Sequence, residues 1–421
     1  MRVSKSLALL GLFRAATAAP APVAQDETPT LSIPTEVPSD PSVALDQLEA
    51  LASATAELLQ ADIAEGNGTA ERRGLSLSGS CTLSKLKIRR EWSTLSKTQR
   101  KDYIHAVQCL QSKPAKTPSG QAPGAKTRFD DFVALHIQQT LEIHYTGNFL
   151  SWHRLYTWLY EEALRNECGY TGTQPYWNWG LSALTGLQNH AAFDGSDTSM
   201  SGDGEFIANK ADIFINAGDL PPIRLAAGTG GGCVKSGPFK DMKVNLGPVS
   251  LETPGGITVS NPEGPLAYNP RCLKRDLSTH INRAYSNGSA VLANVVRPTN
   301  VNDFQLQMQG IPGSGNIGIH GGGHFSLGGD PGRDFFTSPG DPMFYLHHAM
   351  IDRVWWLWQE LSPRQRTQGS TAIAGTRTFM NGPPSPDATI EDILNMGYVG
   401  ESRAIKDVLS TTGGPFCYIY L

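Results

Sequence analysis

The sequence predicts a mainly α-helical protein whose long helices are joined by long loops, with little β-structure. Residues 93–111, 128–144, 153–167 and 341–360 place apolar side chains at helical spacing. Ser96 and Gln99 form a capping-box pattern at the start of the first of these segments. Between about 180 and 338, Gly and Pro are frequent and clear alternation is scarce, which favours loops with short strands or turns. Loops of this length usually shape a site.

Composition places the chain among ordinary globular proteins. It has 421 residues, 39% of them apolar and 18% charged. The formal net charge of −4 gives no reason to expect nucleic acid or an anionic membrane as a partner. No segment after the N-terminus offers eighteen consecutive apolar residues, so we expect no membrane span. The oligomeric state is not predicted.

The N-terminus has the features of a protein made for export. Arg2 and Lys5 precede the apolar run "SLALLGLF" and the small residues "RAATAA", which indicates a signal peptide over residues 1–18. Residues 19–73 are rich in Pro, Ala and acidic residues, contain one amphipathic helical stretch, and end at the dibasic pair Arg72 and Arg73. We interpret this part as a pro-segment, and residues 74–421 as the functional domain. The alternative is a solvated charge pair in a linker.

Six cysteines lie beyond the dibasic pair, with no CxxC among them, which argues against a thiolate metal site. An even count in an exported chain predicts three disulfides, although six cysteines allow 15 pairings and the sequence does not choose among them. Asn67 and Asn287 begin glycosylation sequons, which is consistent with export.

The histidines form two groups that suggest a metal centre. The groups are His136, His144 and His153, and then His320, His324 and His348. Neither group has an Asp or Glu at a matching ligand position, and imidazole alone suits copper or zinc. A redox metal in an oxidising compartment favours copper. "HGGGH" by itself is a weak signal, because three glycines disfavour a regular helix, although they also permit close approach of backbone or substrate.

His347 and His348 stand side by side in the helix predicted from Asp341. Adjacent helical residues point about 100° apart, so the two rings cannot face one centre in the same way. Apolar residues follow both histidines at helical spacing. The helical pattern therefore does not decide which of the two binds a metal.

Two segments resemble the copper signatures of the tyrosinase and polyphenol oxidase family. "HYTGNFLSWHRLYTWLYEE", from His144, is similar to the first signature, and "DPMFYLHHAMID", from Asp341, is similar to the second. The resemblance extends from roughly residue 85 to residue 420. It implies a four-helix bundle around a dinuclear copper site, with two copper ions held by the six histidines. It also implies that His348, four residues before Asp352, is a ligand and His347 is not.

The resemblance assigns roles to two further residues. Asp352, one turn after His348, would orient imidazoles through hydrogen bonds, and its alternative is an ion pair with Arg353 or another basic group. Phe335, thirteen residues before His348, would be the gate that covers the second copper and stacks on an entering ring, and its alternative is a core aromatic beside Phe336. His105, His190 and His280 match no ligand position, so we expect them to be structural or solvated.

Departures from the family pattern refine the expected activity. Family members that hydroxylate monophenols often use a glutamate shortly before the second copper's first ligand and an asparagine after it. Here Gly321 follows His320, and no Asp or Glu lies between Asp303 and His320. Together with Phe335, this predicts a catechol oxidase that converts o-diphenols or o-aminophenols into o-quinones with O2. The alternatives are a full tyrosinase, a haemocyanin-like oxygen binder and a zinc hydrolase.

Two more comparisons with the family give structural expectations. Many members link a cysteine to the second ligand of the first copper, but Glu142 is two residues before His144 and no cysteine lies nearby upstream, so we expect no thioether. Tyr418 and Tyr420 resemble the tyrosine motif that closes the family's catalytic domain, and we expect no C-terminal shielding domain after it.

Overall fold

The computed structural model describes residues 31–65, 81–215 and 220–421. The expected signal peptide over residues 1–18, the sequon at Asn67 and the dibasic pair Arg72 and Arg73 lie outside the described residues. In the part that is described, we find no helix long and apolar enough to cross a membrane.

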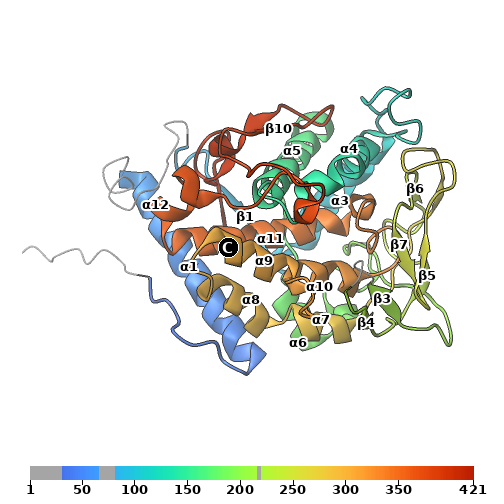
Figure 1. The fold of residues 1–421 in the computed structure, drawn as a ribbon, viewed down its shortest axis with the longest axis horizontal. Coiled ribbons are helices and arrows are strands. Elements are labelled where there is room, and N and C mark those ends of the chain that lie inside the picture. Colours follow the sequence, from blue (N-terminus) through green and yellow to red (C-terminus); the bar gives the residue numbers. More distant parts are fainter. Residues whose placement is uncertain (1–30, 66–80, 216–219) are drawn as a thin grey trace, which may run out of the picture. The chain divides into compact units, whose positions relative to one another are not determined.

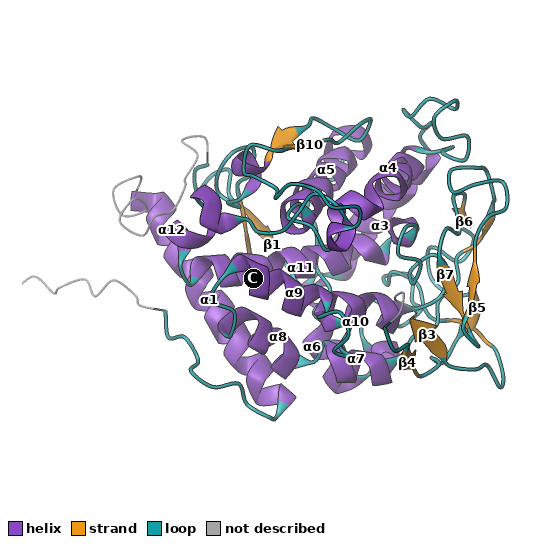
Figure 2. Cartoon of the chain, in the orientation of Figure 1, coloured by secondary structure: helices purple, strands orange, loops and turns teal. Residues whose placement is uncertain are grey.

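Helices dominate the described chain, as Figures 1 and 2 show. They are α1 (Pro41–Glu65), α3 (Lys97–Ser112), α4 (Arg128–Ile143), α5 (Phe149–Cys168), α6 (Trp179–Thr185), α7 (Thr279–Tyr285), α8 (Gly288–Val296), α9 (Val301–Gln309), α10 (Gly318–Leu327), α11 (Met343–Glu360) and α12 (Pro363–Arg366). Helix α5 packs against α3, α4 and α11, and α10 packs against α7, α9 and α11.

The strands are short and form two-stranded pairs. They are β1 (Lys87–Arg89), β2 (Gly204–Phe206), β3 (Ile213–Ile215), β4 (Ile223–Leu225), β5 (Gly231–Val234), β6 (Lys243–Val244), β7 (Leu251–Thr253), β8 (Ile257–Val259), β9 (Arg271–Cys272), β10 (Ile393–Leu394), β11 (Arg403–Ala404) and β12 (Tyr418–Tyr420). β1 runs parallel to β12, whereas the pairs β2–β5, β3–β4, β6–β9, β7–β8 and β10–β11 are antiparallel. The prediction of a helix-rich fold with little β-structure is confirmed.

The four long helices predicted from periodicity are present as α3, α4, α5 and α11. Ser96 and Gln99 make both hydrogen bonds of the predicted capping box at the start of α3. α11 begins at Met343 rather than Asp341, and the Asp341 carboxylate accepts a hydrogen bond from the Met343 N–H at 2.9 Å. Asp341 therefore satisfies a free N–H of the first turn, as a capping residue does.

Residues 180–338 contain more helix than the sequence predicted. Most of this region is loop with short strands, as predicted, but the sequence did not predict α7, α8, α9 and α10, which lie in the same region. Ser278, Asn287 and Asn300 each accept a hydrogen bond from the N–H three residues later, which caps α7, α8 and α9. The helices are short, seven to nine residues in these three, which made their periodicity hard to see.

Helix α10 forms in spite of the three glycines in "HGGGH". A Cβ at Gly322 would lie 2.9 Å from the Tyr285 Cβ of α7, and a Cβ at Gly323 would lie 2.2 Å from Cε1 of His347. Only glycine permits such close packing. The close contacts with α7 and α11 offset the low helix propensity of glycine.

Helix α1, which the sequence assigned to a pro-segment, packs on the rest of the domain. It contacts α6, α8 and α11, and its leucines, including Leu48 and Leu59, are buried. The Glu49 carboxylate pairs with the buried guanidinium of Arg353 at 2.7 Å and accepts a hydrogen bond from Asn178 at 2.9 Å. This part of the expected pro-segment is therefore built into the fold.

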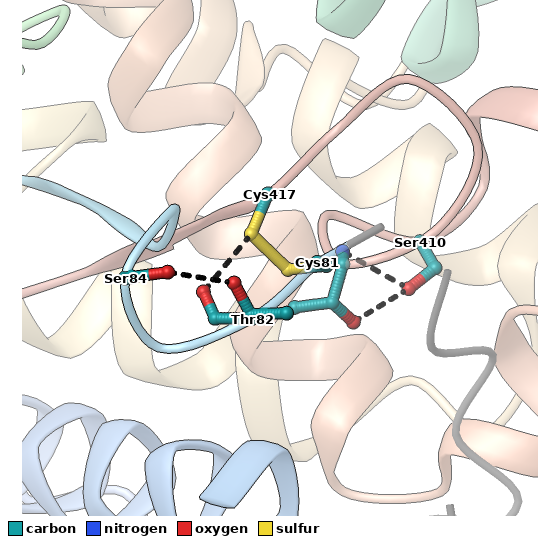
Figure 3. Close-up of a disulfide and its surroundings, with 6 residues drawn as sticks. Cys81, Thr82, Ser84, Ser410 and Cys417 are labelled. Carbon is teal, nitrogen blue, oxygen red and sulfur yellow. Dashed lines mark hydrogen bonds between the residues drawn. A yellow bond between two sulfur atoms is a disulfide. The ribbon is translucent and has the colours of Figure 1, made fainter. Parts of the chain in front are cut away.

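Three disulfides join Cys81 to Cys417, Cys109 to Cys168, and Cys233 to Cys272. The predicted number is confirmed, and all six cysteines are used. Figure 3 shows the Cys81–Cys417 bond beside Thr82 and Ser84. Because β1 pairs with β12 a few residues away, this disulfide and the strand pair hold the two ends of residues 81–421 together.

Candidate metal centre

The first histidine group comes from α4, its C-terminal end and α5. His136 lies within α4, His144 is the residue that follows it, and His153 lies in α5. All three side chains are buried. The ring centroids of His136 and His144 are 5.2 Å apart, and those of His144 and His153 are 4.9 Å apart. One nitrogen from each ring lies within 4.8 Å of the others, which is a spacing that a single metal ion can bridge.

Backbone carbonyls orient all three rings of this group. Nδ1 of His136 is 2.8 Å from the Phe336 carbonyl oxygen, Nδ1 of His144 is 2.9 Å from that of Thr140, and Nδ1 of His153 is 2.8 Å from that of Phe149. Each Nδ1–H therefore donates to a carbonyl, which leaves Nε2 as the lone-pair nitrogen. Within the described chain, Nε2 of His136 and of His153 is buried with no hydrogen-bond partner. Such nitrogens fit a metal ion.

The second group contains four histidines. His320 and His324 lie in α10, and His347 and His348 lie in α11. Nε2 of His320 and Nε2 of His324 are 3.2 Å apart, so the two rings point to one spot. The ring of His348 stacks on His153 of the first group with centroids 4.5 Å apart. The two groups are thus neighbours, as a dinuclear centre requires.

His347 lies in the second group although the resemblance did not assign it. One of its nitrogens lies within 4.8 Å of those of His320, His324 and His348. Its ring centroid is 4.4 Å from that of His324 and 5.2 Å from that of Trp179. Neither His347 nor His348 makes a hydrogen bond through its ring to any described residue. The arrangement of the described residues therefore does not by itself choose between these two histidines.

Burial keeps the clustered imidazoles uncharged. It lowers the pKa of His136 to about 3 and that of His324 to about 4. The pKa values of His144, His153, His320, His347 and His348 also lie well below the usual range, again chiefly because of burial. Neutral imidazoles are the form that binds metals. Within the described residues neither group includes a carboxylate, so the donor set fits copper.

A cavity of about 560 Å³ opens onto both groups. His144, His320 and His324 line it, together with Phe335. Most of the remaining lining is apolar. The apolar residues include Ile215, Leu220, Ile223, Ile311, Ile317, Phe325 and Phe379. The polar residues Ser250, Glu252, Arg333, Asp334 and Ser338 also line the cavity. A cavity of this kind, apolar with a few polar groups, is typical of a small-molecule site.

Comparison with known families identifies the kind of centre. Residues 126–361 match the model of the common central domain of tyrosinase, and they include both histidine groups. The chain belongs to the tyrosinase family. This confirms the family resemblance that was inferred from the two copper signatures. Members of the tyrosinase family are oxidoreductases with a dinuclear copper site.

Several fungal tyrosinase relatives are similar over most of their length. The chain is 40% identical over 334 residues to tyrosinase P of Aspergillus terreus, covering 79% of this chain and 91% of the relative. It is 39% identical over 350 residues to N-acetyl-6-hydroxytryptophan oxidase of Emericella nidulans, covering 81% and 93%. These relatives support an oxidoreductase.

A solved structure gives the same fold. A polyphenol oxidase variant from Thermothelomyces thermophila superposes with a TM-score of 0.77 and 43% identity, covering 92% of this chain and 99% of that one. Residues 74–421 amount to about 83% of this chain, so the superposed part extends into residues before Gly74. This agrees with the packing of α1 against the domain.

Asp352 makes contacts other than those expected. Its carboxylate accepts hydrogen bonds from Arg154 at 2.5 Å, from Arg89 at 3.3 Å, and from the hydroxyls of Tyr418 and Tyr420 at 2.7 and 2.6 Å. None of these partners is an imidazole. The expected bond to an imidazole was therefore wrong, and the alternative of an ion pair was right, although with Arg154 and Arg89. Asp352 joins α11 to α5, β1 and the tyrosines of β12.

Phe335 lines the cavity, but its contact is with the first group. Its ring centroid lies 4.5 Å from that of His144 and 5.7 Å from that of Phe379. The expectation placed it over the second copper. It is half-buried, so part of the ring is free to meet an entering ligand.

Glu252 is a cavity residue that sequence reasoning missed. The family's glutamate lies shortly before the ligand at position 320, whereas Glu252 comes from β7. Burial, and to a lesser extent Asp334, raises its pKa to about 7, against the opposing effect of Arg333. No motif marks this residue, and only the packing of β7 at the cavity reveals it.

The other histidines lie outside both groups. His190 is buried and pairs with the Glu91 carboxylate at 3.1 Å, while its Nδ1 accepts from the Ala192 N–H. His105 and His280 are exposed. These placements agree with the structural and solvated roles expected for them.

Proposed function

We propose that this chain is a secreted dicopper polyphenol oxidase that oxidises o-diphenols or o-aminophenols to o-quinones with O2. The observation that carries the proposal is the pair of adjacent histidine groups, of which His144, His320 and His324 line an open cavity. His136, His144 and His153 would hold one copper, and His320, His324 and His348 the other. When bound, the copper pair supplies the redox chemistry by which two catechols transfer four electrons to O2.

The residues of the chain position the substrate and the ligands. The apolar cavity wall excludes water and binds an aromatic ring, and the ring of Phe335 offers a stacking surface beside His144. Backbone carbonyls hold the imidazoles of the first group, which reduces the reorganisation needed when metal binds.

Hydroxylation of monophenols is the second candidate activity, and Glu252 is the observation that favours it. A carboxyl with a pKa of about 7 is partly ionised at neutral pH and suits the acceptance of a phenolic proton. Against it stands the glycine at position 321, where hydroxylating members often have asparagine. We favour o-diphenol oxidation because Gly321 directly follows His320, which is one of the proposed copper ligands.

The cavity and the donor set argue against the two remaining alternatives, an oxygen binder and a zinc hydrolase. A haemocyanin-like oxygen binder would hide its coppers from phenols, whereas here a cavity of about 560 Å³ reaches His144, His320 and His324. A dinuclear zinc hydrolase normally needs carboxylate ligands, and neither histidine group in the described chain contains one.

The proposal is tested with the full-length protein, expressed with its own signal sequence and loaded with copper. We expect two copper ions per chain by metal analysis, and rapid O2 uptake with 4-tert-butylcatechol and o-aminophenol. Tyrosine should be consumed slowly and after a lag. Equal rates on tyrosine and catechol without a lag would favour the tyrosinase alternative. Zinc in place of copper, or copper without any O2 uptake, would reject the oxidase.

Export is part of the proposal. The signal-like N-terminus and the three disulfides support it, because disulfides persist in oxidising compartments. We propose cleavage after Ala18 and a second cleavage after Arg73, and N-terminal sequencing of the secreted protein tests both.

A further inference from the structure

Arg333 is a buried cation in the wall of the cavity. Its residue is 8% exposed, and it lines the cavity together with His320 and His324. It follows Gly332, whose carbonyl oxygen is 3.2 Å from Nδ1 of His324. Its Nε–H donates to the backbone carbonyl of Glu252 at 2.8 Å, which fixes the guanidinium plane against β7. The guanidinium is therefore held at the wall of the cavity that His320 and His324 also line.

The carboxylates nearest to Arg333 are bound to other cations. Asp276 accepts a hydrogen bond from Lys210 at 2.6 Å, and its second oxygen forms a longer ion pair with Nη1 of Arg333 at 3.9 Å. Asp330 is held by Arg271 through two hydrogen bonds of 2.7 and 2.8 Å. Neither of these two described carboxylates makes a hydrogen bond to the guanidinium of Arg333, so its terminal nitrogens keep donors for a further anion although Asp276 lies within ion-pair distance.

The two carboxyl groups that line the cavity, those of Asp334 and Glu252, do not form an ion pair with Arg333. Asp334 accepts backbone N–H bonds from Val249 and Ser250 on one oxygen, and from Phe336 and Thr337 on the other. Its hydrogen-bonding capacity is thus used by the backbone, which is a neutral donor set. Burial raises the pKa of Asp334 from its ordinary value, and these backbone hydrogen bonds oppose the rise.

Glu252 contacts Arg333 through its backbone and not through its carboxyl. Oε2 of Glu252 is buried and makes no hydrogen bond to the described residues. Its raised pKa means that it carries only part of a negative charge at neutral pH. Burial lowers the pKa of Arg333 from its ordinary value, and Asp276 and Glu252 oppose this only in part. Such a guanidinium is suited to an additional anion.

The size of the cavity implies a substrate larger than a bare phenol. Its volume, about 560 Å³, falls in the range of about 300–1,000 Å³ that encloses drug-sized ligands. Ile215, Ile223 and Ile317 contribute apolar surface between its polar residues. A phenol that lies over the histidines therefore leaves room for an apolar chain and a polar end group.

We infer that Arg333 is a specificity-determining residue that binds a carboxylate at the end of the substrate's ring substituent. This inference rests on the proposed function, since it assumes that the phenol ring lies at the two histidine groups. The substrate class is a phenolic or catecholic alkanoic acid, whose carboxylate accepts hydrogen bonds from the terminal nitrogens of Arg333 while its alkyl chain lies on the isoleucines.

The test compares two substrates that differ only in charge, 3-(3,4-dihydroxyphenyl)propionic acid and its amide. In the parent enzyme we expect KM for the acid to be about tenfold lower than for the amide, as charge-assisted hydrogen bonds predict. In Arg333→Met this ratio should approach one through a rise in the acid's KM. The matched control is Arg224→Met, because the Arg224 side chain in β4 is 73% exposed and lies outside the cavity lining. It should keep the parent ratio.

A second variant tests the inference independently if Arg333→Met fails to fold. Glu252→Gln keeps the guanidinium and removes the partial negative charge beside it, so the acid's advantage over the amide should grow by about threefold. Parent enzyme that treats acid and amide equally would overturn the inference, and so would a ratio that survives in Arg333→Met or shrinks in Glu252→Gln.

Binding measured without turnover separates this inference from the proposed function. We use 3-phenylpropionate and 3-phenylpropanamide, which carry no phenolic hydroxyl, and measure their dissociation constants with copper-loaded protein by calorimetry. Tighter binding of the propionate, lost in Arg333→Met, supports the subsite even if no catechol is oxidised. Equal binding of the two ligands overturns the subsite even if 4-tert-butylcatechol is oxidised rapidly.

Discussion

The two histidine groups are built in different ways. In the first group every Nδ1 is held by a backbone carbonyl, and for His144 and His153 that carbonyl belongs to the residue four positions earlier. In the second group, as far as the described residues show, only His324 has such a partner, from Gly332. The second group also holds a fourth ring, His347, with no hydrogen bond to the described chain.

This difference shows which group depends on local structure and which on packing. The first group is positioned mainly by the helices that carry it, so its ligand nitrogens are set before any metal binds. The second group is positioned by the contact of α10 with α7 and α11, through glycines that leave no room for a Cβ. Changes in packing should therefore affect the second group more than the first.

The largest expected effect distinguishes the two adjacent histidines of α11. His348→Ala should reduce bound copper from two ions to one per chain. Its turnover of 4-tert-butylcatechol should fall by more than about 100-fold, which is the most that the loss of a hydrogen bond to a metal ligand usually costs. His347→Ala should keep both ions and lose at most about tenfold. Metal analysis and initial rates measure both. Loss of copper in His347→Ala with retention in His348→Ala would reverse the ligand assignment.

A smaller effect is expected from Gly323→Ala. The new Cβ would lie 2.2 Å from Cε1 of His347, so either the buried His347 ring must shift or α10 and α11 must separate. We expect a loss of about 1–3 kcal/mol in the free energy of unfolding and a copper affinity about tenfold weaker at one of the two sites. Chemical denaturation and copper titration measure these changes.

Gly323→Ala has two controls. One adds a methyl group where there is open space, and the other removes the ring with which the new methyl group would clash. A methyl group at Gly120 would have no described atom within 4 Å, so Gly120→Ala should change neither quantity. The double variant Gly323→Ala with His347→Ala removes the clashing ring and should recover part of the lost stability, because coupled sites are not additive. If both copper ions weaken equally in Gly323→Ala, the packing difference between the groups is not the cause.

The last expected effect concerns pH and the cavity wall beside the second group. The pKa of Glu252 is about 7 in the folded protein and near 4.5 when exposed, so the unfolded chain loses this proton first as pH rises. Stability should therefore fall between about pH 4.5 and 7, by up to about 3.4 kcal/mol, and level off above pH 7. Glu252→Gln should remove this part of the pH dependence of thermal unfolding. An unchanged profile would show that Glu252 ionises normally.

The sequence predicted the long helices and the six proposed ligands because both leave local patterns. Helical periodicity and the capping box of Ser96 depend on neighbouring residues, and the copper signatures are short segments. Helix α10 was missed because its glycines lower helix propensity, and only contacts with α7 and α11 explain why it forms. The caps at Ser278, Asn287 and Asn300 were a local signal that was present and not used.

The roles of Asp352 and Glu252 depended on residues far apart in the chain. Asp352 is bound by Arg89, and by tyrosines at the end of the chain that were interpreted only as a closing motif. Glu252 reaches the cavity from β7, some seventy residues before His320. Sequence spacing carries no information on such contacts.

The ion pair between Glu49 and Arg353 has a consequence for maturation of the protein. A protease that cuts after Arg73 breaks the chain but leaves α1 seated on α6, α8 and α11, because its buried leucines and this ion pair do not involve the cut bond. The nicked protein would then elute from a sizing column as one particle, and separate into two polypeptides only when it is denatured.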